Sequence, residues 1–66
     1  MGTNYDKSLL VTEKVAAAYL GVSVSCLQKW RVQGRGPRFI KIGRAVRYRI
    51  SDLDDFISGN TIGPSR

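Results

Sequence analysis

Residues 12–34 of this 66-residue chain read TEKVAAAYLGVSVSCLQKWRVQG, and they carry the clearest structural signal in the sequence. Each half of it starts with a residue that favours helix N-caps and ends with a glycine that favours helix C-termini. The caps are Thr12 and Ser23, and the stops are Gly21 and Gly34. Apolar side chains recur between them at helical spacing. The stretch predicts helices at about 13–20 and 24 to 32 or 33, joined by a tight turn, which is the pattern of a helix-turn-helix.

Two β-rich runs follow, and a two-residue link of the Gly-X type joins them. Such a link predicts a tight hairpin. With Gly43-Arg44 as the loop, the facing pairs are Ile42 with Ala45, Lys41 with Val46, and Phe39 with Tyr48. Both faces carry apolar residues, so the pattern alone leaves other registers open. Residues 34–38, rich in glycine and arginine, are expected to form the turn that leads into the hairpin.

A last helix of about seven residues is expected to begin at Ser51 as its N-cap. Asp52 would support its positive end, and the apolar stripe would consist of Leu53, Phe56 and Ile57. Leu9-Leu10-Val11 forms an apolar start that could be extended. We expect one compact domain over residues 9–58, mainly α with a small β-hairpin, between flexible segments at 1–8 and 59–66.

So short a chain has few apolar side chains with which to build a core. The residues expected to form it are Leu9, Leu10, Val11, Val15, Ala16, Leu20, Val22, Leu27, Trp30, Tyr48, Leu53, Phe56 and Ile57. Trp30 follows Leu27 by three residues, so we interpret it as a core anchor and not as a base-stacking side chain.

The charges are strongly segregated along the chain, which carries a net charge of +6. No acidic residue lies between Glu13 and Asp52, whereas nine of the eleven basic residues do. Asp52, Asp54 and Asp55 follow together. Separation of this kind is typical of a surface that meets a polyanion, most commonly nucleic acid.

The composition argues against catalysis, metal binding and membrane insertion. There is no histidine, and Cys26 is the only cysteine. The sequence therefore offers no nucleophile–base pair and no metal-ligand set, and we expect no enzyme activity, no cofactor and no small-molecule substrate. No apolar run is long enough to span a membrane, so we expect a cytoplasmic protein without a membrane partner.

Two sets of side chains are candidates for DNA contact. On the second helix, which would enter the major groove, they are Ser23, Val24, Ser25, Gln28, Lys29 and Arg31. On the turn and on the hairpin, whose residues 41–47 we call the wing, they are Arg35, Arg38, Lys41, Arg44, Arg47 and Arg49. Other interpretations remain open: a polar solvated helix face, cations that guard an edge strand against aggregation, and a merely flexible connector.

Several short motifs, taken in order, resemble the excisionase-type DNA-binding domains of the MerR-like winged-helix superfamily. The matching pieces are Leu10-Val11-Thr12, Ala17 to Ser23, Leu27 with Trp30, Gly36-Pro37, Lys41 to Arg44, Arg47-Tyr48, and Ser51 to Leu53 before Phe56-Ile57. Phe56 stands where many relatives carry tryptophan. The resemblance implies a winged helix-turn-helix that binds and bends attachment-site DNA and biases an integrase toward excision.

Alternatives to this role share the same basic surface. Relatives of the AlpA type act as transcriptional regulators of prophages or mobile elements, and the sequence does not separate the two roles. An RNA-binding or protein-interaction module is a further alternative. Because one module of this size offers a small interface, we expect several copies to associate on adjacent DNA sites.

Overall fold

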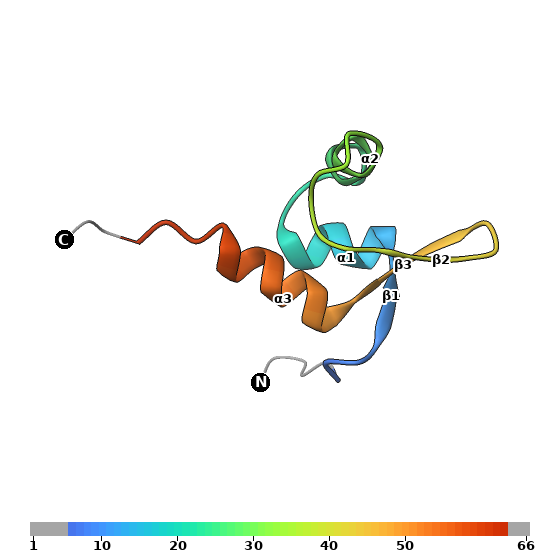
Figure 1. Cartoon of the computed structure of the whole chain (residues 1–66), viewed down its shortest axis with the longest axis horizontal. Coiled ribbons are helices and arrows are strands. Elements are labelled where there is room, and N and C mark those ends of the chain that lie inside the picture. The colour runs from blue at the N-terminus through green and yellow to red at the C-terminus, as the bar shows by residue number, and fades with distance from the viewer. Residues whose placement is uncertain (1–5, 64–66) are drawn as a thin grey trace.

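The computed structural model describes residues 6–63, which form three helices and a three-stranded sheet (Figure 1). The elements are, in order, β1 (Leu10–Thr12), α1 (Glu13–Leu20), α2 (Val24–Val32), β2 (Ile40–Ile42), β3 (Ala45–Arg49) and α3 (Ile50–Gly59). In Figure 1, α2 lies above α1 and the β2–β3 hairpin extends to the right, whereas α3 extends to the left. The predicted winged helix-turn-helix fold is confirmed.

The first two helices begin and end at the predicted residues. The Oγ1 atom of Thr12 accepts a hydrogen bond from the Val15 amide at 3.3 Å, and the Oγ atom of Ser23 accepts one from the Cys26 amide at 3.0 Å. Gly21, with φ of 75°, allows the chain to leave α1 in the left-handed region. Only residues 21–23 separate the end of α1 from the start of α2, so the two helices are joined by a tight turn.

The predicted hairpin register is confirmed, with Ile42 opposite Ala45 and Lys41 opposite Val46. Gly43 has φ of 62°, a conformation that suits the first residue of a two-residue loop. The sheet has a third strand, because β1 pairs with β3 and places Val11 opposite Tyr48. The apolar start at Leu9-Leu10-Val11 thus supplies the strand that closes the other side of β3.

The expectation that Ser51 caps α3 is wrong. The helix begins at Ile50, spans ten residues and has no side-chain cap. Its first amides are instead satisfied from the N-terminal segment: Ile50 donates to the Leu9 carbonyl at 3.0 Å, and Ser51 donates to the Lys7 carbonyl at 2.9 Å. Residues 7–9, partly in the segment expected to be flexible, therefore act as the main-chain cap of α3.

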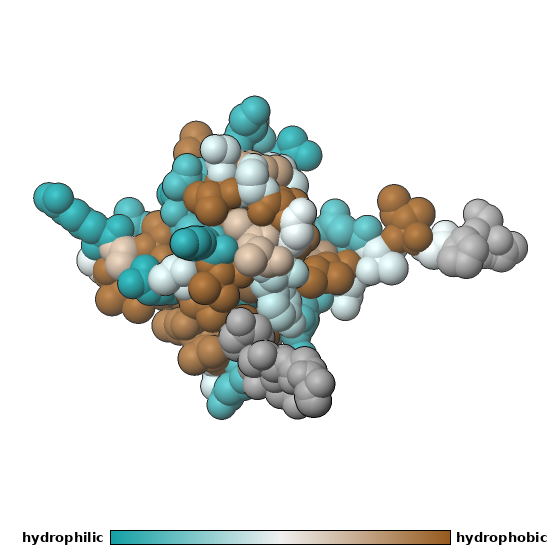
Figure 2. Space-filling view, turned by 180° about the vertical axis from the view of Figure 1, so that it is seen from behind, coloured by the Kyte–Doolittle hydropathy of each residue, from teal (hydrophilic) through white to brown (hydrophobic). Residues whose placement is uncertain are grey.

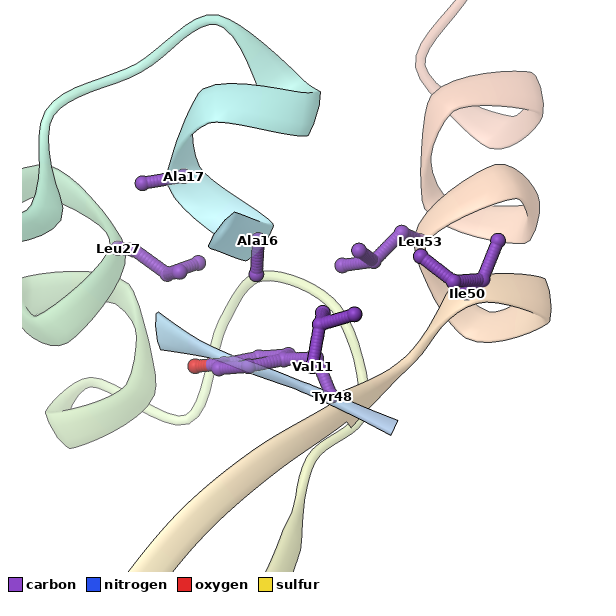
Figure 3. Packing of buried hydrophobic residues seen from close by; sticks show 7 residues of the cluster. All are labelled: Val11, Ala16, Ala17, Leu27, Tyr48, Ile50 and Leu53. Carbon is purple, nitrogen blue, oxygen red and sulfur yellow. The ribbon is translucent and has the colours of Figure 1, made fainter. Parts of the chain in front are cut away.

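The core lies between the inner face of the sheet and the three helices. Figure 3 shows the side chains of Val11, Ala16, Tyr48 and Leu53 converging there, with Leu27 pointing in from α2. The buried hydrophobic residues of this core are Val11, Ala16, Ala17, Leu27, Tyr48, Ile50 and Leu53. Burial raises the pKa of the Tyr48 phenol.

Of the expected core residues, Leu27, Tyr48 and Leu53 are buried, while Leu20, Val22 and Trp30 pack half-buried against them. Phe56 is half-buried, and its ring centroid lies 5.5 Å from that of Trp30. The expectation that Leu9, Leu10 and Ile57 belong to the core is wrong, because all three side chains are exposed. Leu10 pairs with Arg49 and neighbours the inward-facing Val11, so strand alternation places it on the outer face of the sheet.

Candidate nucleic-acid interface

The exposed side of α2 and its N-cap carry four of the six side chains predicted on this helix to contact DNA. Ser23, Ser25, Gln28 and Lys29 are exposed there, whereas Leu27 points into the core. Val24 packs against the core instead of facing solvent freely. Ser23 uses its hydroxyl to cap the helix. The side chains left to meet a ligand directly are therefore those of Ser25, Gln28 and Lys29.

Arg31, also predicted to contact DNA, is held by an acidic side chain of α1. Its Nη2 and Nε atoms donate to the Oε2 atom of Glu13 at 2.8 and 3.2 Å. The guanidinium also lies over the Phe39 ring, 5.7 Å from its centroid. Hydrogen bonding to Glu13 raises the pKa of Arg31. Arg31 thus ties α2 to α1 and to the residue that precedes β2.

The tip of the hairpin projects beyond the body of the domain (Figure 1), and seen from behind it carries hydrophilic side chains (Figure 2). Lys41 and Arg44 are exposed there. Arg47 and Arg49 lie at the base of the hairpin, where Arg47 donates to the Val46 carbonyl at 2.9 Å. Arg49 pairs with Asp52 at 3.2 Å. The cations of the hairpin therefore divide into a free pair at the tip and an engaged pair at the base.

The turn over residues 34–38 packs against α2 and α3. A Cβ atom at Gly36 would lie 3.0 Å from the Cβ atom of Trp30, so the backbone approaches the indole closely. Pro37 is buried, and the Arg35 amide donates to the Trp30 carbonyl at 2.7 Å. The Arg35 and Arg38 side chains remain exposed beside a pocket of about 360 Å³. The turn thus holds both arginines on a packed backbone.

Six cationic side chains have neither a hydrogen bond nor an ion pair within residues 6–63, and they come from α1, α2, the turn and the hairpin. They are Lys14, Lys29, Arg35, Arg38, Lys41 and Arg44. One acidic residue of α3, Asp54, is bonded to groups outside this set, because it accepts hydrogen bonds from Lys7 and from the Tyr19 hydroxyl. The free positive charge therefore lies on the elements that a winged helix-turn-helix turns toward DNA.

A tight helix-turn-helix followed by a basic hairpin defines a small DNA-binding domain of the winged helix-turn-helix class. The family model described as a helix-turn-helix domain matches residues 10–61, so the chain belongs to that family. The family includes small DNA-binding proteins of the excisionase and AlpA types. Among curated proteins, no sequence matches this chain. Within residues 6–63, the helices are too short to cross a membrane.

Glu13 has a role at this surface that its position in the sequence did not indicate. Besides binding Arg31, its carboxylate accepts from the side-chain amide of Gln28 at 3.1 Å. Gln28 and Arg31 follow Glu13 by 15 and 18 residues. No spacing rule within one helix connects such positions, because the contact exists only once the turn has folded α2 against α1.

Proposed function

We propose that the chain binds specific sites on double-stranded DNA, with α2 in the major groove and the wing along the backbone and minor groove. The observation that carries this proposal is the set of six cations on α1, α2, the turn and the hairpin that have no partner among the described residues 6–63. In the proposal Ser25, Gln28 and Lys29 face base edges and phosphates, while Arg35, Arg38, Lys41 and Arg44 bind phosphates. Val24 and Arg31 position the helix.

The biological role we propose is that of an excisionase, which binds and bends attachment-site DNA and directs a cognate integrase toward excision. The order of motifs from Leu10 to Ile57 and the helix-turn-helix family support it. A transcriptional regulator of the AlpA type is the second candidate, because it would use the same surface. An excision assay separates them: an excisionase increases product only when the integrase is present, whereas a regulator changes transcription without it.

The DNA surface is tested by titrating duplex DNA at several salt concentrations with Lys29→Ala and Arg44→Ala variants. With five or six phosphates neutralised, the log–log salt slope of the wild type should be about −5. Arg44→Ala should weaken binding to all sequences alike and flatten the slope by about one unit, whereas Lys29→Ala should also alter site preference.

Lys7→Ala is the matched control, since it removes the same charge from a residue that pairs with Asp54 of α3. It should change the affinity far less than either variant of the DNA surface. Unchanged affinity and slope in Arg44→Ala would remove the support for the wing contact.

We also propose that copies associate on adjacent sites, since a single module of this size offers little interface. Binding isotherms on DNA with one and with two neighbouring sites measure this directly. Equal affinity per site on both DNAs would contradict cooperative assembly.

A further inference from the structure

Glu13 is an acidic side chain placed beside the helix that is proposed to enter the major groove. Within residues 6–63 it is the acidic residue that hydrogen bonds to α2, and both carboxylate oxygens are used. Oε2 accepts from Arg31 and Oε1 accepts from Gln28. An acid near a polyanion is unfavourable unless its charge is neutralised, and Arg31 provides that neutralisation.

The Glu13–Arg31 pair is held firmly enough to orient a third group. Their side chains are only 20% and 24% exposed, and Arg31 is further placed by the Phe39 ring. Glu13 itself lies in the first turn of α1, where the helix dipole favours a negative charge. Gln28, by contrast, is exposed on α2 next to Lys29. A partly buried anchor thus contacts an exposed amide.

The chemistry of this contact determines which way the amide of Gln28 faces. A carboxylate can only accept hydrogen bonds, so Gln28 must turn its NH₂ group toward Glu13. The carbonyl oxygen and one N–H remain available. An acceptor and a donor side by side are what a glutamine presents to the N6 and N7 atoms of adenine in the major groove.

We infer that Glu13 is a positioning residue that orients Gln28 to recognise adenine at one position of the DNA site. The inference rests on the proposed function, because it requires α2 to face base edges. Holding the amide in place before binding reduces the rotamer entropy lost on contact with the base.

The test is selection of sites from a randomised duplex library, followed by competitive titration of all four bases at each selected position. The variants are Gln28→Ala, Glu13→Gln and the double variant, and Asp55→Asn controls for the loss of one negative charge. Gln28→Ala should reduce the preference for adenine at one position by about tenfold. Glu13→Gln should reduce it at that same position, and the double variant should match Gln28→Ala, as expected for coupled residues. Asp55→Asn should leave every preference unchanged.

A second measurement reports on the free protein and does not depend on DNA binding. Gln33 provides an internal reference, because it is the other glutamine of the chain and its exposed side chain makes no hydrogen bond within residues 6–63. In NMR spectra the side-chain amide of Gln28 should be more ordered than that of Gln33. This difference should disappear in Glu13→Ala or, if that variant unfolds, in Glu13→Gln.

Three results would overturn the inference. They are an unchanged adenine preference in a folded Glu13→Gln variant, independent additive effects in the double variant, and a Gln28 amide as mobile as that of Gln33. A wild-type protein that selects no sequence at all would instead overturn the proposed function, and this inference with it.

Discussion

Gly36 occupies the most crowded glycine position of the turn between α2 and β2. Its φ is 84°, and a Cβ atom there would lie 3.0 Å from the Trp30 Cβ and 3.3 Å from the indole Cε3. Both the backbone conformation and the close approach to Trp30 therefore disfavour any side chain at this position. The Gly36-Pro37 motif has a structural reason that does not depend on DNA.

We expect Gly36→Ala to lower the free energy of unfolding by about 1–3 kcal/mol, since it adds a steric clash to an unfavourable φ. Gly34→Ala is the matched control, because its φ of 72° is similar while its Cβ would meet open space. That variant should cost about 1 kcal/mol. Urea unfolding followed by circular dichroism measures both, and equal losses would contradict the packing argument.

At the scale of the elements, helices begin in two different ways in this domain. The cap of α2 comes from the side chain of the residue before it, whereas the cap of α3 comes from main-chain carbonyls 41 residues before Ile50 and 44 residues before Ser51. Serine therefore has different roles at Ser23 and Ser51. The former caps a helix, and the latter lies within one.

Ser23→Ala should destabilise the domain by about 1 kcal/mol, because it leaves the Cys26 amide without its partner. Ser51→Ala should change stability by less than about 0.5 kcal/mol, since its side chain makes no cap. Thermal unfolding of the two variants compares them directly. A loss at Ser51 as large as that at Ser23 would contradict the observed start of α3.

At the scale of the whole molecule, Asp54 connects α3 with α1 and with the N-terminal segment. It accepts hydrogen bonds from Lys7 and from the hydroxyl of Tyr19. These hydrogen bonds hold the pKa of the Asp54 carboxyl below its ordinary value, and the bond from Lys7 has the larger effect. The ionised form is therefore favoured by folding.

This shift predicts how stability depends on pH. Because the pKa of Asp54 is lower in the folded than in the unfolded state, its contribution is present above about pH 4 and is lost as the pH falls through the folded value. The difference in unfolding free energy between wild type and Asp54→Asn should therefore shrink on acidification. Asp55→Asn is the control. A difference independent of pH between 7 and 3 would contradict the role of the ionised carboxyl.

The helix-turn-helix and the hairpin could be predicted from the amino-acid sequence, because their signals are local. Ser23 lies three residues from the amide it caps, Gly21 directly follows α1, and Gly43 lies between the strands that it joins. Each conformation depends on bonds within a few residues, which a linear pattern can show.

The third strand, the start of α3 and the partners of Glu13 could be identified only from the folded chain. Val11 pairs with Tyr48 in the sheet. The main-chain carbonyls of Lys7 and Leu9 cap α3. Glu13 binds Gln28 and Arg31 across the turn between α1 and α2. The same holds for the predicted contact surface, where Arg31 is engaged by Glu13 while Lys29 stays free. These contacts join residues far apart in the chain, so they arise only after packing of the apolar core has brought the elements together.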